Sequence, residues 1–353
     1  MDSDWTERLR DRSLAAAAAG TPLAVTGGGT KEFLGRITQA EHFDVSGHRG
    51  IVSYEPTELV LSARGGTPLA EVTAALAERG QMLAFEPPSF GAEATIGGTI
   101  ATGLSGPARP YAGAARDFVL GTRVLNGKGE VLRFGGEVMK NVAGYDVSRL
   151  MTGACGTLGV LLDVSLKVLP LPAVSRTLAF DVTAAEAIER CNTWAARPLP
   201  VTGACHDGER LRVRLAGTER GVAAAAGALG GEVVEGDAFW KALREHTLAF
   251  FTRTGAPLWR VSVPPGAAMT EPEGDLLVDW GGALRWLCTE APVAEVRAAA
   301  ERAGGHAALF RGGDRTGEVF HPLQPAVRRI HERLKAAFDS AGIFNPGRMY
   351  EGI

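Results

Sequence analysis

Apolar and polar residues alternate most regularly between Val160 and Val168, where the apolar side chains all fall on one side of an extended chain. A period of two over nine residues predicts a half-buried strand. The Asn126-Gly127 pair between two apolar runs predicts a hairpin. Shorter apolar runs predict further strands at 21–26, 51–54, 59–63, 118–125 and 131–134.

After Pro172 the pattern changes, and strands alternate with amphipathic helices. Thr183 and Glu186 are spaced as a capping box, and Gly281-Gly282 predicts a second hairpin. The expected fold class is therefore α+β, with an antiparallel sheet covered by helices. Strands are expected at 211–215, 276–280, 284–287 and 307–310, and helices at 237–251, 293–303 and 325–341, with a further helix that begins at Thr183.

The change of pattern predicts two domains, residues 1–172 and residues 173–353. The segment 344–350 is too apolar and turn-rich for a free end, so we expect it to fold back onto the first domain. In the last helix, Val327, Ile330 and Leu334 form the apolar face. The opposite face is expected to be solvated and to carry Arg328, Arg329, Arg333 and Lys335.

Composition narrows the class of protein. The 353 residues carry a net charge of −3 with no block of like charges, so a nucleic-acid partner has no electrostatic support. The N-terminus is acidic, and the apolar run at 14–19 is too short to span a bilayer. We expect a cytoplasmic protein that reaches the inner face of the cell membrane only peripherally, through partners. The four cysteines are scattered with no C-x-x-C pair, so neither a four-thiolate iron–sulfur cluster nor another metal site is expected.

Glycine is concentrated before Pro170, above all in two stretches, 26–31 and 90–103. Backbone amides in glycine-rich turns form concave anion sites that no side chain blocks, so we interpret the two stretches as halves of one phosphate-binding cradle. Two structural turns are the alternative. A Rossmann fingerprint is excluded because Glu32 stands where the third glycine is required. Lys31 either serves the cradle or faces solvent.

Two further loops combine polar residues with glycine. In the stretch 112–118, Asp117 either accepts a hydrogen bond from a ligand or only caps a turn. In the stretch 140–146, a lysine, a tyrosine and a carboxylate lie close together on a loop, which is more typical of a site than of a scaffold. Asp146 alone is also a good N-cap for the helix that follows.

These motifs resemble the vanillyl-alcohol-oxidase-like, or PCMH-type, FAD-binding family, and within it the FAD-binding subunits of bacterial glycolate oxidases. The resemblance extends over nearly the whole chain and implies a two-subdomain PCMH-type domain followed by a cap domain. It rests on the stretches GGGTK (27–31), EPPSFGAEATIGGTIATG (86–103), RPYAGAARDFVLGTRVLNGKGEVLRFGG (109–136), MKNVAGYDVSRLMTGACGTLGV (139–160) and FNPGRMY (344–350).

The resemblance implies FAD as cofactor, and the first loop has no His or Cys for a covalent link, so binding is expected to be non-covalent. The resemblance assigns binding of the FAD pyrophosphate to Gly27, Gly28, Gly29, Thr30 and Lys31. The remaining cofactor contacts are assigned to Thr95, Ile96, Gly97, Gly98, Thr99, Gly103, Gly113, Asp117, Gly156, Thr157, Gly159 and Val160.

For the chemistry, the resemblance implies oxidation of a small 2-hydroxy acid, glycolate, with electrons passed to an iron–sulfur subunit. The histidine-rich motif of full dehydrogenases in the family is missing, so oxidation is expected to involve a second flavoprotein subunit. The alternatives are a self-sufficient dehydrogenase and a non-catalytic relay or scaffold. His306, as base, and Arg285, as carboxylate clamp, are the candidates for catalysis by this chain.

Overall fold

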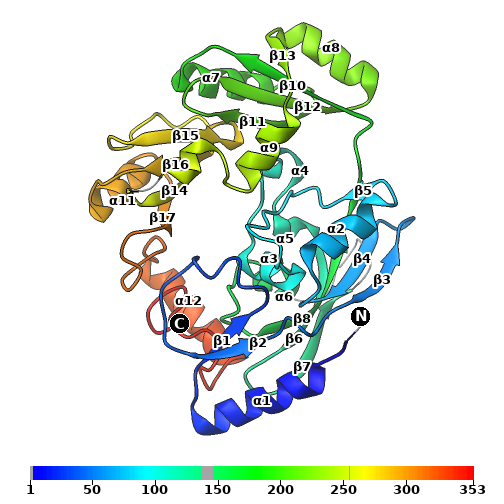
Figure 1. The fold of residues 1–353 in the computed structure, drawn as a ribbon. Coiled ribbons are helices and arrows are strands. Elements are labelled where there is room, and N and C mark those ends of the chain that lie inside the picture. The colour runs from blue at the N-terminus through cyan, green and yellow to red at the C-terminus, as the bar shows by residue number, and fades with distance from the viewer. Residues whose placement is uncertain (1–2, 137–145, 254) are drawn as a thin grey trace. The chain divides into compact units, whose positions relative to one another are not determined.

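The computed structural model describes residues 3–136, 146–253 and 255–353, and contacts within the chain divide it into two compact units (Figure 1). The first unit comprises Met1–Leu104, Ala114–Pro170 and Arg315–Ile353. The second comprises Ser105–Gly113 and Leu171–Asp314. Relative to the boundaries predicted from the sequence, the short segment before Ala114 joins the second unit, and the final helix joins the first.

The first unit is built on an antiparallel sheet of five strands in the order β3-β4-β8-β6-β7. A parallel pair, β1 and β2, is extended by residues 343–345, because Leu23 N donates to Ile343 O and Asn345 N donates to Leu23 O. The strands are β1 (Leu23–Thr26), β2 (Glu41–Asp44), β3 (Ile51–Glu55), β4 (Val60–Arg64), β5 (Gln81–Met82), β6 (Val119–Leu125), β7 (Val131–Gly135), β8 (Val160–Lys167) and β9 (Leu169–Pro170).

The core of the first unit joins its earliest and latest residues. Phe43 of β2 and Phe344 near the C-terminus are fully buried, with ring centroids 6.2 Å apart, and they pack with Leu162 of β8. Burial of such large apolar side chains is the main force holding these segments together. The helices of this unit are α1 (Thr6–Ala19), α2 (Leu69–Ala77), α3 (Ile96–Thr102), α5 (Ala115–Phe118), α6 (Val147–Met151) and α12 (Pro325–Phe338).

The second unit is one antiparallel sheet of eight strands in the order β13-β10-β12-β11-β15-β16-β14-β17, with α7 and α8 packed on its β10–β12 part (Figure 1). Its strands are β10 (Val174–Phe180), β11 (Val201–His206), β12 (Leu211–Gly217), β13 (Glu232–Val234), β14 (Leu258–Ser262), β15 (Asp275–Asp279), β16 (Leu284–Cys288) and β17 (His306–Arg311). Its helices are α4 (Arg109–Ala112), α7 (Ala184–Ala195), α8 (Glu219–Leu229), α9 (Asp237–Arg244), α10 (Ala249–Thr252), η1 (Trp280–Gly282) and α11 (Val293–Arg302).

The expected α+β class is confirmed, as are both hairpins and the capping box at Thr183 and Glu186.

The solvated position expected for Lys335 is wrong. Its side chain is buried and its ammonium group donates to Thr157 O, Phe344 O and the carboxylate of Asp339. These three bonds use all its donors and tie α12 to the segment 155–160. Among the described residues, no helix is both long and apolar enough to cross a membrane.

An aromatic cluster surrounds His246 in the second unit. Its imidazole is stacked on Phe251 at 3.9 Å between ring centroids and meets the edge of Trp286 at 4.6 Å. Burial first, and then the positive charges of Arg311 and Arg260, lower the pKa of His246 well below its ordinary value. The folded chain therefore holds this histidine neutral at neutral pH.

This burial predicts a pH dependence of stability. In the unfolded chain His246 binds a proton below its ordinary pKa of 6.5, whereas in the folded chain it stays neutral, so acidification below pH 6.5 favours unfolding. The free energy of unfolding should fall by about 1.4 kcal/mol per pH unit from this group. In His246→Phe, urea titrations over the same pH range should show a slope shallower by that amount. Equal slopes in the two proteins would contradict the assignment.

Candidate functional site

A pocket opens within the first unit where the loop after β1 meets helix α3 and the loop after α6. Its walls come from four parts of the chain that are far apart in sequence. They are residues 25–34 with Val45, residues 95–102, residues 151–161, and the C-terminal pair Asn345 and Arg348.

The first loop presents backbone amides to this pocket. Among the described residues, none accepts a hydrogen bond from the amides of Gly27, Gly28, Gly29 or Thr30. Gly29 has a φ of +71°, in the left-handed region that glycine adopts without strain. Consecutive unpaired N–H groups in such a turn form a nest for an anion. The arrangement fits a phosphate group because the donors are fixed before any ligand arrives.

The second loop contributes differently from the sequence prediction. The amides of Ile96, Gly97 and Gly98 are already paired, with Thr67 O, Gly65 O and Thr95 Oγ1 respectively. They are therefore not free to bind phosphate, and the cradle of amides is formed by the first loop. The second loop instead provides close packing. A Cβ on Gly28 would lie 1.5 Å from Glu93 O, so only glycine allows the two loops to touch.

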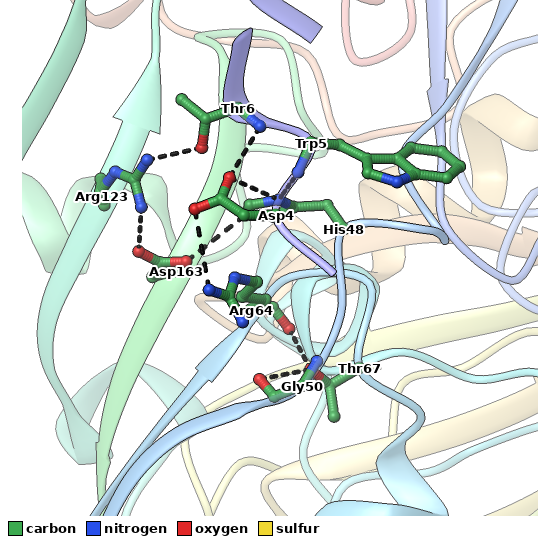
Figure 2. A network of polar contacts seen from close by, with 9 residues as sticks. All are labelled: Asp4, Trp5, Thr6, His48, Gly50, Arg64, Thr67, Arg123 and Asp163. Atoms are coloured by element: carbon green, nitrogen blue, oxygen red, sulfur yellow. Dashed lines mark hydrogen bonds and ion pairs between the residues drawn. The ribbon is translucent and has the colours of Figure 1, made fainter. Parts of the chain in front are cut away.

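A buried polar network holds the start of α3 in place (Figure 2). Thr67, whose carbonyl receives the Ile96 amide, has its hydroxyl bonded to Arg64 O and Gly50 N. Around it, His48 Nδ1 accepts from the Trp5 amide at 2.9 Å, and its Nε2 lies 3.4 Å from Asp163. The backbone of the second loop is thereby fixed to the sheet and to the N-terminal residues.

Arg123 completes this network from β6. Its guanidinium bonds to Asp163 at 2.7 Å and to the Thr6 hydroxyl (Figure 2). Burial alone would raise the pKa of Asp163, but His48 and Arg123 lower it overall. Asp163 therefore remains ionised in the folded chain and supports the sheet beneath the pocket.

Asn345 connects two walls of the pocket. Its Oδ1 accepts from Val25 N at 2.9 Å, and its Nδ2 donates to Cys155 O at 2.7 Å. The residue is buried, with a φ of +43° that asparagine tolerates better than most side chains. The end of β1 and the loop after α6 are thus joined through a single amide group.

The charged residues of the pocket are Lys31, Glu32 and Arg348. Lys31 is buried and donates to Ser89 O at 3.2 Å, which excludes the solvent-facing alternative. Arg348 reaches the carbonyl of Glu32 at 3.3 Å. Two cations against one carboxylate favour an anionic ligand.

Burial raises the pKa of Cys155 to about 11, so its thiol stays protonated and a poor nucleophile.

Of the cofactor residues predicted from sequence, eleven line the pocket: Gly27, Gly28, Gly29, Thr30, Lys31, Thr95, Gly97, Gly98, Gly156, Gly159 and Val160. Ile96, Thr99, Gly103 and Thr157 lie behind this lining and fix α3 and the following loops. Asp117 accepts from Ala114 N at 2.9 Å, which is the capping alternative. Gly113 belongs to the second unit. The stretch 140–145 lies outside the described residues, while Asp146 caps α6.

The catalytic pair predicted from sequence does not form. Arg285 pairs with Val261 on β14, whereas His306 pairs with the next residue, Ser262. Side chains in successive cross-strand pairs point to opposite faces of a sheet. The side chains of Arg285 and His306 therefore cannot act on one substrate. Arg285 is fully buried and bonds to Glu271, Ala267 O and Ala268 O. It holds the segment 267–271 and is no carboxylate clamp.

Sequence reasoning missed several residues of the pocket. Asn345 and Arg348 lie in a stretch for which the sequence predicts only a packed tail. Cys155 also lines the pocket, with its thiol kept protonated by burial. An apolar part of the wall was also missed and consists of Val25, Leu34, Val45, Ala101, Met151, Ala154 and Leu161.

Comparison with known proteins identifies the class of protein. A family model described as an FAD binding domain matches residues 6–135. The crystal structure of p-cresol methylhydroxylase with substrate bound has the same fold, with a TM-score of 0.71 over 99% of this chain and 88% of that one, at 15% identity. Fold, pocket and family model define an FAD-binding flavoprotein with the PCMH-type fold.

Two curated relatives narrow the assignment. The glycolate oxidase subunit GlcE of Escherichia coli (strain K12) is 50% identical over 99% of this chain and 98% of its own length. The chain belongs to the family of this subunit. The glycolate oxidase subunit GlcD of Bacillus subtilis (strain 168) is 32% identical over 36% of this chain and 27% of its own length.

Replacement of Gly98 tests whether the cofactor occupies this pocket. A Cβ there would meet, within 4 Å, only Thr95 Oγ1 at 3.2 Å, so a leucine side chain extends into the pocket and displaces FAD. Gly98→Leu should be purified without flavin absorbance but with a melting temperature close to that of the flavin-stripped unmodified chain. Gly227→Leu, at an exposed helical glycine with open space around it, is the control and should keep its flavin. Full flavin content in Gly98→Leu would place the cofactor elsewhere.

Replacement of Gly28 is expected to affect the fold, unlike replacement of Gly98. The sequence alone predicts that a bulky residue at either glycine removes the flavin and spares the fold. Since a Cβ on Gly28 would overlap the backbone of Glu93, replacement there should disturb the loops themselves. Gly98 is therefore the position at which loss of cofactor can be separated from loss of structure.

Proposed function

We propose that this chain is an FAD-carrying subunit of a glycolate-oxidising complex. The near full-length similarity to the Escherichia coli subunit carries the proposal. The pocket supports it, because its amides and cations suit the diphosphate of a dinucleotide. When bound, FAD supplies an acceptor for the two electrons released as a 2-hydroxy acid becomes a 2-oxo acid.

The chain's own residues would then bind and insulate the cofactor. The amides of Gly27–Thr30 hold the diphosphate, assisted by the charges of Lys31 and Arg348. The apolar wall excludes water from the remainder of the pocket. Attachment is non-covalent, because the lining contains no histidine among the described residues and the Cys155 thiol is kept protonated.

The partners are a second flavoprotein subunit and an iron–sulfur subunit. The cysteines of this chain are scattered along the sequence, which supports placing the iron–sulfur centre on another polypeptide. Among the described residues there is also no cluster of His, Cys, Asp and Glu able to hold a metal ion. The failure of the His306–Arg285 pair supports participation of a second flavoprotein subunit in substrate oxidation. The subunit would work in the cytoplasm and reach the membrane only through its partners.

Anaerobic absorbance spectroscopy tests this proposal. The purified chain should show a flavin band that glycolate leaves unchanged, and the band should bleach when the second flavoprotein and iron–sulfur subunits are added. A complex assembled from Gly98→Leu and the same partners is the control, because it shows whether the bleached flavin is the one bound by this chain. Bleaching by glycolate with the chain alone would favour a self-sufficient dehydrogenase. A colourless chain that takes up no added FAD would contradict the proposal outright.

A further inference from the structure

Helix α12 exposes the apolar face that its sequence pattern predicts. Val327 and Ile330 are 40% and 56% exposed, and Leu334 is partly exposed. Because these residues are spaced three and four apart, they lie on one face of the helix. Two exposed alanines, Ala326 and Ala337, extend the same face on either side of Ile330. Among the described residues, no other helix or strand has two large apolar side chains that are exposed.

The orientation of α12 is fixed from its other side. Lys335 is buried, and its ammonium group donates to Thr157 O and Phe344 O. The same group is paired with Asp339. Rotation of the helix to cover its apolar face would break these bonds and leave a buried charge without partners, which is strongly destabilising. The apolar face therefore stays on the outer side of α12.

Two arginines border this apolar face. Arg329 and Arg333 are exposed and four residues apart, so they project side by side next to Ile330. Among the described residues, neither makes an ion pair or a hydrogen bond, and the one carboxylate of α12, Glu332, is paired with Arg328 instead. Like charges at this spacing destabilise a helix. A surface that supplies both apolar groups and anions would complement the face.

The features of the face favour a protein surface as its complement. In a two-fold pair of this chain the same residues would meet each other, so arginines would approach arginines. Helices that lie in a membrane interface carry large aromatic and leucine side chains, whereas this face is made mainly of valine, isoleucine and alanine. The net charge of −3 also gives the chain no overall attraction to anionic lipid.

We propose that the face formed by Val327, Ile330 and Leu334, with Arg329 and Arg333 at its border, docks onto an apolar surface edged with carboxylates on a partner subunit. The choice of a partner subunit rests on the proposed function, in which this chain is one subunit of a complex. The chemistry assigned to the partner surface rests on α12 alone.

Sedimentation velocity of the flavin-loaded chain, mixed with the second flavoprotein subunit and the iron–sulfur subunit, tests the docking face. Ile330→Glu places a carboxylate within the apolar face and should weaken assembly by about tenfold or more, because buried apolar anchors dominate interface energies. Arg333→Glu should weaken assembly by about tenfold and make it less sensitive to salt. Both positions are exposed, so both variants should keep the flavin band and the melting temperature of the unmodified chain.

Matched controls come from the second unit. Val293→Glu changes a valine that is 45% exposed on α11, and Arg220→Glu reverses the charge of an exposed arginine near the start of α8. Both controls should assemble as the unmodified chain does. Equal weakening in the controls would show a general effect of added negative charge and would overturn the inference.

The possible results separate this surface from the function proposed above. Unchanged assembly of Ile330→Glu and Arg333→Glu would overturn the inference even if the complex oxidises glycolate. So would a dimer of the unmodified chain that Ile330→Glu dissociates, or binding of the chain to phosphatidylglycerol vesicles that Ile330→Glu abolishes. Loss in Ile330→Glu alone would overturn the acidic character assigned to the partner.

Selective loss of assembly in both α12 variants would establish the surface. It would do so even if the assembled complex failed to oxidise glycolate, in which case only the proposed substrate fails. Absence of assembly with the unmodified chain would contradict both the docking surface and the proposed function.

Discussion

The buried side chain of Asn345 joins two walls of the pocket in the first unit. Asn345 accepts a hydrogen bond from the end of β1 and donates one to the loop after α6. These two segments are separated by about 130 residues of chain, and Asn345 comes almost 200 residues later. The bond to Cys155 is buried and the bond from Val25 is partly buried, and an unpaired polar group left in a buried place costs about 1–3 kcal/mol. The bond to Val25 thus helps to hold the end of β1, from which the first glycine loop starts.

Asn345 is itself held by neighbours that converge on the same place. Phe344 packs on Phe43 in the core, and the Phe344 carbonyl receives a bond from Lys335. Lys335 is paired with Asp339, and the carboxylate of Asp339 in turn accepts from the Phe344 amide. Because a broken buried ion pair leaves an uncompensated charge, this part of α12 cannot move without cost. The C-terminal segment is therefore a structural part of the pocket, which Asn345 and Arg348 line.

The two glycine loops serve different purposes once this frame is in place. The amides of Gly27–Thr30 in the first loop donate to no partner among the described residues, whereas those of Ile96, Gly97 and Gly98 in the second loop are paired with Thr67, Gly65 and Thr95. Glycine is needed in both, but for different reasons. In the first loop it allows a left-handed turn at Gly29 and contact with the backbone at Glu93, and at Gly97 it allows contact with Gly65.

Local sequence patterns predicted the structural features that depend on interactions between neighbouring residues. The alternation along β8, the Asn126-Gly127 hairpin and the cap at Thr183 are properties of neighbouring residues, and the structure has all three. The glycine loops were also recognisable, because glycine weakens an ordinary helix or strand and so many bare backbone positions together indicate close approach of a ligand or another segment. The class of cofactor followed from them together with the resemblance to a known family.

Features that depend on distant parts of the chain could not be predicted in this way. Sequence spacing places Lys335 on the polar face of a helix, but only tertiary contacts bury it against Thr157 and Phe344. His306 and Arg285 are plausible partners until the register of β14 with its two neighbours sends them to opposite faces.

The central claim is that free amides of the first loop hold the diphosphate of FAD, and comparison of two ligands tests it most directly. Fluorescence titration of the flavin-stripped chain should be done with FAD and with riboflavin, which has the same ring system but no diphosphate. Two charge-assisted bonds of ordinary strength make FAD bind about a hundredfold more tightly or better. Equal affinity for the two flavins would show that the loop amides do not bind the diphosphate, and the assignment of the pocket would be wrong.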